Sequence, residues 1–468
     1  MPAPKVSVIV PAYNGAKFLK ETIRSVLAQT YAHWELVIVD DASPDDTAKV
    51  VAQFDDPRIK YLAHEKNKGS DVARDTGLRA SSGELIAFLD QDDLIHPEKF
   101  QVHVSFLDAH PEIGVTYNAR FHLNHSSTTI REIWRPPQSI TLAALVLGFP
   151  LAPSDVVLRR EWALAMDLLN GSLSWCGGEI IHYGGLFLSG CKFAGIERAL
   201  NYRRFHSGRW IRDLAGGCQS EIYAQDKIFA DPRCPASVRA LAGIAHANIY
   251  LIWAYRAFAQ EETALGQEFL GNAVHGKPSI IEGVPCELVN FFLTCSLDDD
   301  SLNHAALLKQ IFAQLPPELS RLAAQYDWAV ARGFAIKGAR AVMWDRPEDG
   351  RRYFEQAVER GAQFDESFMS LVTQYLIDYE TEFGESAAQK KLRALSPYLE
   401  KLGGRASVRK LVGCYAVNRA FQSYRAGEYS QVPARIIPAV ANEPRYLLNR
   451  GVLAVLLRST IAGMTGQS

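Results

Sequence analysis

Three widespread phosphate- and metal-binding patterns are missing from this sequence. It has no G-x-G-x-x-G segment after its first apolar run and no G-x-x-x-x-G-K-[S/T] segment anywhere. Neither a dinucleotide fold nor a P-loop therefore supplies phosphate binding. Its seven cysteines include no C-x-x-C pair, which argues against a zinc site and fits free thiols in a reducing compartment.

Charge and hydropathy exclude further classes. The net charge of -2 gives no overall basic field, so we expect no nucleic acid as a partner. No uncharged apolar run is long enough to span a bilayer, and the start MPAPKVSVIVPAYN lacks the regions of a signal peptide. We therefore expect a cytoplasmic chain, whose 468 residues are enough for two or three domains.

The first half does contain alternating strand and helix patterns. Apolar runs at 6–10, 35–39, 59–62 and 85–89 predict strands, and the segments between them have helical spacing. Such alternation predicts right-handed βαβ units and a parallel sheet. The carboxyl ends of these strands gather along one edge, where α/β sheets bind nucleotides.

The fourth run, in GELIAFLDQDD, leads directly into Asp90, Asp92 and Asp93. Such close carboxylates repel each other unless a cation holds them. Since no glycine-rich phosphate loop is present, a divalent cation on Asp90 and Asp92 would bridge to a diphosphate. A polar turn after a core strand is the alternative interpretation.

Four segments in this order resemble glycosyltransferase family 2: VSVIVPAYN, ELVIVDDASPDDT, NKGSDVARDTGL and GELIAFLDQDD. The resemblance covers roughly the first half of the chain. It implies an α/β GT-A fold, a nucleotide-diphospho-sugar donor and inversion at the anomeric carbon. It also implies that Pro11, Tyr13 and Asp41 contact the nucleoside, Tyr13 through its ring and Asp41 by accepting from a base N–H. Arg74 would steady the diphosphate.

The resemblance also implies a metal site for Mn²⁺ or Mg²⁺. Asp92 matches the direct ligand, and Asp90 would bond the ribose or the metal. Asp93 would orient its neighbours or cap the following turn. His206, in the segment YRRFH, matches a third ligand, with structural or solvent-exposed histidine as the alternative. Asp71 stands where many relatives have a small residue, and an acid near the phosphates has no explanation in the sequence.

The base is the point where this chain departs from the family pattern. The resemblance implies an acidic pair before Gly190, and Glu179 matches its catalytic member while Gly178 replaces the other acid. Glu179 could still remove the proton of the acceptor hydroxyl, or it could merely cap the helix that follows. Asp155 and His182 are the alternative bases. Trp175 could stack on a sugar or pack in the core.

The region at 118–139 is polar and irregular, and it predicts a mobile loop over the acceptor.

From about residue 236 the pattern becomes helical throughout. We therefore expect a GT-A domain at 1–225 and an all-α domain at 226–468. Residues 256–274 match 340–358, and a weaker copy starts at Arg419. These matches predict tetratricopeptide-like hairpins with a face for a protein or glycan; a plain helical bundle is the alternative.

The sequence leads to one main functional expectation. We expect metal-dependent, inverting transfer of a sugar, from a donor expected to be UDP-linked, to a glycan, lipid-linked or glycoconjugate acceptor in surface polysaccharide biosynthesis. A sugar-nucleotidyltransferase would need a glycine-rich loop that PAYNGAKF lacks. A degenerate sugar-nucleotide-binding scaffold, whose helical domain binds a protein partner, remains the alternative. The segment 446–464 would dock on the helical domain or lie peripherally on the inner membrane surface.

Overall fold

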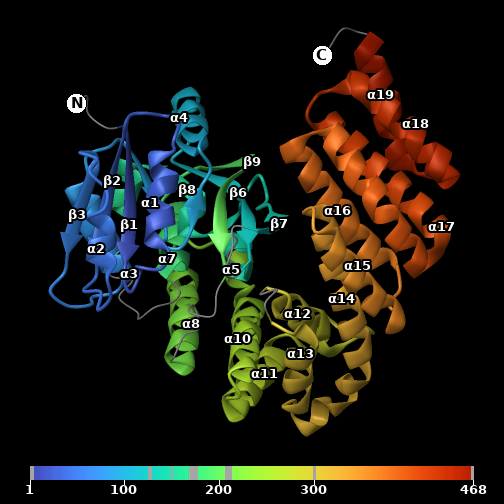
Figure 1. Cartoon of the computed structure of the whole chain (residues 1–468), viewed down its shortest axis with the longest axis horizontal. Coiled ribbons are helices and arrows are strands. Elements are labelled where there is room, and N and C mark those ends of the chain that lie inside the picture. The colour runs from blue at the N-terminus through green and yellow to red at the C-terminus, as the bar shows by residue number, and fades with distance from the viewer. Residues whose placement is uncertain are drawn as a thin grey trace. The chain divides into compact units, whose positions relative to one another are not determined.

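The computed structural model describes residues 5–124, 129–148, 151–166, 168, 178–205, 213–298 and 302–464. The chain divides into two compact units, Met1–Tyr326 and Asp327–Ser468, and Figure 1 shows the elements of both. The change from strands to helices comes at α8 (Leu214–Ala230). The predicted domain boundary between residues 225 and 226 lies inside α8. That boundary stays a prediction.

The first unit is built on one mixed sheet, which has nine strands in the described residues (Figure 1). The order is β3-β2-β1-β4-β8-β6-β9-β5, with β7 paired to β6. β1 to β4 are parallel, as predicted, and β8 runs antiparallel to both β4 and β6. The strands are β1 (Val6–Ala12), β2 (Trp34–Asp40), β3 (Ile59–Ala63), β4 (Leu85–Phe88), β5 (Leu94–Ile95), β6 (Val115–Leu123), β7 (Ile130–Trp134), β8 (Val156–Arg159) and β9 (Phe193–Arg204).

Two hydrophobic cores lie on the two faces of this sheet. Val8 and Val10 of β1 belong to one core, while Ile9 between them belongs to the other. This alternation explains why a parallel strand reads as a continuous apolar run. Each such side chain, fully buried, stabilises the fold by about 1.5–3 kcal/mol. The helices among the strands are α1 (Leu19–Leu27), α2 (Thr47–Val51), α3 (Ser70–Ala80), α4 (Lys99–Ala109), α5 (Leu142–Gly148), α6 (Arg160–Ala165) and α7 (Gly178–Leu188), with η1 (Pro153–Asp155).

The predicted mobile loop at 118–139 is wrong over much of its length, because β6 and β7 form an antiparallel hairpin there. All nine residues of β6 are buried. Its polar side chains pair with other buried polar groups: Asn118 donates to Asn201, and Arg120 pairs with Asp155. Buried polar groups need such partners. Because these partners lie far away in sequence, the polar residues of β6 read as a loop and not as a buried strand.

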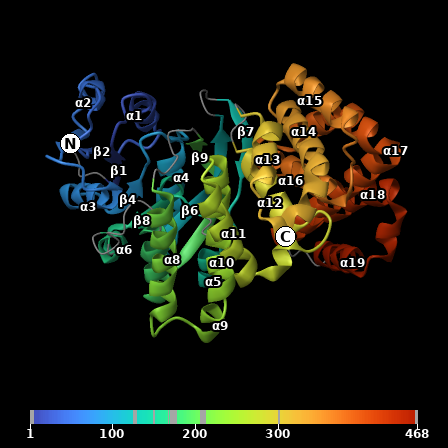
Figure 2. The ribbon, with the colours of Figure 1, turned by 90° about the horizontal axis from the view of Figure 1, so that it is seen from below.

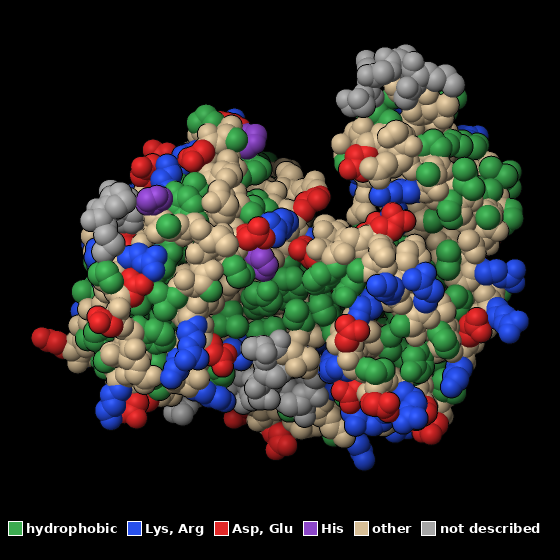
Figure 3. Space-filling view, turned by 45° about the horizontal axis from the view of Figure 1, so that its top comes forward, with side chains coloured by type: hydrophobic (Ala, Val, Ile, Leu, Met, Phe, Trp, Pro, Cys, Tyr) green, Lys and Arg blue, Asp and Glu red, His purple; other side chains and the backbone are tan. Residues whose placement is uncertain are grey.

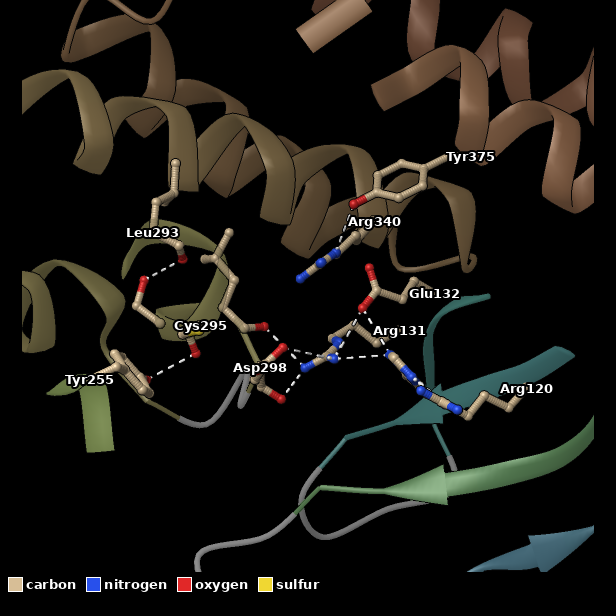
Figure 4. A network of polar contacts seen from close by, with 12 residues as sticks. Arg120, Arg131, Glu132, Tyr255, Leu293, Cys295, Asp298, Arg340 and Tyr375 are labelled. Carbon is tan, nitrogen blue, oxygen red and sulfur yellow. Dashed lines mark hydrogen bonds and ion pairs between the residues drawn. The ribbon is translucent and has the colours of Figure 1, made fainter. Parts of the chain in front are cut away.

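Helices continue the first unit after the sheet. Arg131 of β7 is fully buried and joins the sheet to these helices. Its Nη1 donates to the carbonyl of Leu297 at 3.0 Å and to that of Asp298, and its Nη2 donates to Glu132 (Figure 4). α10 lies beside both α8 and α11 (Figure 2). The elements are α9 (Ala236–Arg239), α10 (Ala242–Ala259), α11 (Thr263–Gly276), η3 (Pro278–Ile281), α12 (Glu287–Ser296), α13 (His304–Ala313) and η4 (Pro317–Gln325).

The second unit is helical throughout its described residues. α17 is really two helices, since Gly404 has a φ of 76° and breaks it. None of the helices in the described part of the chain combines the length and the apolar character needed to span a bilayer. The elements are α14 (Tyr326–Met343), α15 (Pro347–Glu359), α16 (Glu366–Phe383), α17 (Glu385–Arg425), η5 (Tyr429–Gln431), α18 (Val432–Asn442), η6 (Pro444–Leu448) and α19 (Arg450–Met464).

The two best internal matches in the sequence fold as helical hairpins, α10–α11 and α14–α15. A Cβ on Gly266 of α11 would come 2.5 Å from the ring of Phe258. A Cβ on Gly350 of α15 would come equally close to Val342. Phe258 and Val342 are equivalent in the sequence match, so both hairpins use a glycine at the same close helix contact. Whether they are tetratricopeptide units stays a prediction.

Candidate active site

A pocket of about 490 Å³ lies at the carboxyl ends of β1, β2 and β4. The strand-end motifs predicted from sequence meet there, because parallel strands bring their carboxyl ends to one edge. The lining residues are Pro11, Ala12, Tyr13, Asp41, Asn67, Lys68, Gly69, Ser70, Ala73, Arg74, Asp90, Gln91 and Asp92.

Tyr13 lies at this pocket with 43 % of its surface exposed. Gln91 fixes its backbone: Tyr13 N donates to Gln91 Oε1 at 2.9 Å, and Gln91 Nε2 donates to Tyr13 O at 2.9 Å. An exposed ring on a fixed backbone is suited to stacking on a base. Sequence reasoning missed Gln91, although its position between two aspartates in Asp90-Gln91-Asp92 was a signal.

Asp41 is buried, and its carboxylate organises the loop that forms one wall of the pocket. The backbone N–H groups of Lys68 and Gly69 donate to it at 2.9 and 2.7 Å. His64 Nδ1 lies 2.7 Å from Asp41 Oδ1. A carboxylate has about four acceptor positions, so loop contacts engage most of them. This organising role was not apparent from sequence.

Arg74 is the cation at the centre of the site, and it is nearly completely buried. Its Nη1 donates to Asp71 at 2.9 Å, and its Nη2 donates to Asp90 at 3.0 Å. Glu179 Oε1 is 4.0 Å from Nη1. Burial opposes the charge of Arg74, but Asp90, Asp71 and Glu179 outweigh it, so the pKa of Arg74 is raised. A fixed positive charge therefore lies beside the pocket.

Asp90, Asp92 and Asp93 form the acidic cluster, with ligand atoms that lie within 4.8 Å of one another. Asp93 is fully buried: Ser154 Oγ donates to it at 2.8 Å and Arg204 N at 3.1 Å. These contacts tie the segment after β4 to η1 and β9, while the orienting role of Asp93 stays a prediction. Asp90 and Asp92 line the pocket instead. Their oxygens suit a hard divalent cation such as Mg²⁺ or Mn²⁺.

Glu179 lies in the first turn of α7, with its Oε1 4.0 Å from Arg74 Nη1. Its pKa is raised, chiefly because surrounding protein shields its carboxyl group from water. Arg74 opposes the rise, while Asp71 and Asp90 add to it. A carboxylate with a raised pKa is suited to accept a proton. A negative charge in the first turn also stabilises helix α7 through the helix dipole.

Of the other candidate residues from sequence, two are buried and two lie outside the described residues. Asp155 is fully buried, and Arg120, Asn201 and the backbone of Ala152 occupy its oxygens. His182 is also buried. Asp155 therefore serves a structural ion pair and is not placed to meet an acceptor. Trp175 and His206 lie outside the described residues.

Comparison with known proteins identifies the family. The family model described as "Glycosyl transferase family 2" matches residues 7–162. TuaG of Bacillus subtilis, named "Putative teichuronic acid biosynthesis glycosyltransferase", is 34% identical over 169 residues, which are 36% of this chain and 67% of that protein. The chain belongs to glycosyltransferase family 2. The matched residues contain nearly all of β1 to β4 and the acidic cluster, and the N-terminal mixed sheet has the predicted GT-A fold.

A second relative has a more specific name. WfgD of Escherichia coli, named UDP-Glc:alpha-D-GlcNAc-diphosphoundecaprenol beta-1,3-glucosyltransferase, is 39% identical over 155 residues. The match covers 33% of this chain and only 60% of that protein. The crystal structure of S. aureus TarS covers 75% of this chain and 55% of its own, at 16% identity and a TM-score of 0.40. That likeness is too loose to support any statement about function.

Proposed function

We propose that this protein is a metal-dependent, inverting glycosyltransferase that moves a sugar from a nucleotide diphosphate, UDP in the first instance, to a hydroxyl group. The observation that carries the proposal is the strand-end pocket itself. It combines an exposed aromatic ring, Tyr13, with an acidic pair, Asp90 and Asp92, and the buried cation Arg74. Glu179 lies beyond Arg74 on a different element.

The donor would be held by the groups that line the pocket. Tyr13 would stack on the base, while Pro11 and Asp41 complete the nucleoside wall. Arg74 would add positive charge near the diphosphate. Asp90 and Asp92 would hold Mn²⁺ or Mg²⁺, which when bound neutralises charge on the departing diphosphate. His206, if it follows the family pattern, would complete this set.

Glu179 would act on the acceptor. As the acceptor oxygen attacks the anomeric carbon, its proton passes to a Glu179 carboxylate oxygen. The new bond forms on the face opposite the diphosphate, and the bond between the anomeric carbon and the diphosphate oxygen breaks, which inverts the configuration. The transition state is oxocarbenium-like. The raised pKa of Glu179 suits this step.

The acceptor would be a glycan, a glycoconjugate or a lipid-linked sugar in surface polysaccharide biosynthesis. The name of the E. coli relative supports a lipid-linked acceptor. Exposed apolar residues on η6 and α19, namely Leu447, Leu448, Leu453, Leu457 and Ile461, support a cytoplasmic protein peripheral at the inner membrane. Figure 3 shows hydrophobic side chains gathered on the surface of the second unit. Residues 444–468 contain three arginines and no acid. The helical hairpins offer a face for a protein partner.

The proposal is tested by titrating nucleotide sugars into the wild-type chain with and without Mn²⁺, and into Asp92→Ala. Binding that requires both the cation and Asp92 is expected, with about 30- to 1000-fold weaker binding in the variant. Asp55→Ala, which removes an exposed acid outside the pocket, is the matched control. Proton NMR of the product should find the inverted anomer. No binding of any nucleotide sugar would refute the proposal.

A second function is favoured by one observation, the glycine at position 178. Without the acid expected there, the chain could bind a sugar nucleotide as a scaffold and pass that state to a protein partner. Donor binding that needs Asp92, without turnover on any glycan or lipid-linked acceptor, would favour this scaffold over the enzyme.

A further inference from the structure

Asp71 and Gly178 compete for the same space. Gly178 is the first residue of α7 and Asp71 lies in the first turn of α3. A Cβ built on Gly178 would come 2.5 Å from Asp71 Oδ2 and 3.4 Å from Asp71 Cγ. A distance of 2.5 Å lies well inside van der Waals contact, so a side chain at position 178 and the carboxylate of Asp71 cannot both keep their places.

The carboxylate of Asp71 also controls where Arg74 directs its charge. Arg74 Nη1 donates to Asp71 Oδ1 at 2.9 Å, whereas its distance to Glu179 Oε1 is 4.0 Å. Its other terminal nitrogen, Nη2, donates to Asp90 at 3.0 Å. Both terminal nitrogens of the guanidinium therefore have closer partners than Glu179.

From these contacts we propose that Asp71 is a positioning residue for Glu179, in a space that Gly178 leaves open. By holding Nη1 of Arg74, Asp71 prevents a close ion pair between Arg74 and Glu179. Glu179 then remains available to take a proton from the acceptor. The inference rests on the proposed function. It also accounts together for two departures seen in the sequence, the extra acid at position 71 and the missing acid at position 178.

The charges around Glu179 agree with this role. Arg74 and Asp71 face it from α3, Asp90 from the end of β4, and Tyr183 from its own helix. Burial raises the pKa of Glu179, Arg74 lowers it, and Asp71 and Asp90 raise it again. Loss of Asp71 would remove one repulsion and free Nη1 to approach Glu179. Both changes lower the pKa of the base.

A purely local role for Asp71 makes a different prediction. An acid in the first turn of a helix, paired with an arginine three residues on, stabilises that helix by a few tenths of a kcal/mol. Such a role would affect stability slightly and the reaction not at all. Asp71 does not line the donor pocket, so donor affinity should not depend on it directly.

The first test is Asp71→Ala. We expect kcat for sugar transfer to fall roughly 10- to 100-fold, with the donor KM changed about threefold or less. The acidic limb of the kcat–pH profile should move to lower pH by about one unit, because Glu179 becomes a weaker base. Asp75→Ala is the matched control, since it removes another acid of α3 that pairs with an arginine, Arg79. An unchanged kcat and pH profile in Asp71→Ala would overturn the inference.

The second test uses the shared space. Gly178→Ala should reproduce the loss, because its Cβ displaces Asp71. Gly185→Ala on the same helix should not, since a Cβ there meets nothing within 4 Å. The double variant Asp71→Gly with Gly178→Asp returns one carboxylate to this space and should recover much of the activity that Asp71→Gly loses. Recovery in the double variant cannot come from a general loss of folding. No recovery, with unfolding midpoints like the wild type, would count against the shared space.

A third measurement separates this inference from the proposed function. The pKa of Glu179 can be followed by carbon-13 NMR of labelled glutamate carboxyls, assigned with Glu179→Gln. A lower pKa in Asp71→Ala supports the inference even if no acceptor is found. An unchanged pKa refutes it even if the wild type transfers sugar. Absence of nucleotide-sugar binding by the wild type would instead refute the proposed function.

Discussion

The proposed donor side and the proposed acceptor side of the site are built in different ways. The donor side is built largely on strand ends: β1, β2 and β4 stop at one edge, and residues at and after these ends line the pocket together with the loop before α3 and the first turns of α3. The acceptor side depends on contacts between distant segments, in which α3 and α7 meet at Arg74, Asp71 and Glu179. One side follows from the topology of a parallel sheet, and the other from side-chain packing specific to this chain.

This difference explains why local sequence motifs identify the residues of the donor side more readily than those of the acceptor side. Strand-end residues keep their place as long as the strands keep their register, so a local motif is enough to identify them. A carboxylate beside Glu179, in contrast, can come from any segment whose side chain reaches the same space. Asp71 fills space that a side chain at position 178 would otherwise take. The comparison predicts that donor-side and acceptor-side substitutions separate binding from turnover.

Glu179→Gln should give the largest effect and most directly sharpen the comparison. The amide keeps the shape of the side chain but cannot accept the proton, so kcat should fall roughly 10²- to 10⁴-fold. Donor affinity should stay within about threefold, because Glu179 does not line the donor pocket. Stopped-flow or steady-state release of the nucleoside diphosphate measures kcat. Equal losses of affinity and turnover would break the distinction between the two sides.

Asp155→Ala should act on folding and not on chemistry. It leaves Arg120 buried without its carboxylate partner, which costs about 3–5 kcal/mol of unfolding free energy. Asp56→Ala is a close control, since Arg58 also stacks on a tryptophan, Trp34, but its ion pair is partly exposed. That variant should lose about 1 kcal/mol or less. Urea unfolding measures both values, and a stable Asp155→Ala without activity would return Asp155 to the candidate bases.

Asp41→Asn should weaken the donor side by loosening its wall. The amide cannot accept all the hydrogen bonds that the carboxylate takes from His64, Lys68 and Gly69. This should lower the free energy of unfolding by about 1–3 kcal/mol. Nucleotide affinity should fall together with the thermal midpoint. Asp45→Asn also loses a backbone hydrogen bond, from Ala16, but does not line the pocket. It should lower stability alone, and an equal loss of affinity there would contradict the assignment.

Gln91→Ala should have the smallest effect. It removes two exposed hydrogen bonds that hold the backbone of Tyr13, worth about 1 kcal/mol, or roughly fivefold in nucleotide affinity. Turnover at saturating donor should not change. Gln53→Ala, which removes an exposed amide contact with Lys20 elsewhere, is the control. A large fall in kcat for Gln91→Ala would place it on the acceptor side.

Much of the fold and of the donor side could be predicted from sequence. Strands β1 to β4, their parallel orientation and the acidic cluster after β4 follow from apolar runs and the residues that end them. The β6–β7 hairpin could not be predicted in this way. Asn118 and Arg120 look like loop residues because their partners, Asn201 and Asp155, are far away in sequence.

The acceptor side shows the same limit at a smaller scale. Asp71 and Gly178 each looked anomalous in sequence, and neither carried a local signal that connected it to the other. Only the fold brings α3 against α7 and makes their contact visible. The double role of Asp41, at the pocket and in the loop, was hidden for the same reason, since its partners are backbone N–H groups that any sequence provides.

The central claim is that one pocket binds the donor while a separate carboxylate performs the chemistry. It is tested most directly by measuring nucleotide-sugar Kd and nucleoside diphosphate release on the same preparations of the wild type, Asp92→Ala and Glu179→Gln. The account predicts that Asp92→Ala loses binding, whereas Glu179→Gln binds like the wild type and loses turnover. A Glu179→Gln variant that turns over at the wild-type rate, or an Asp92→Ala variant that binds unchanged, would contradict it.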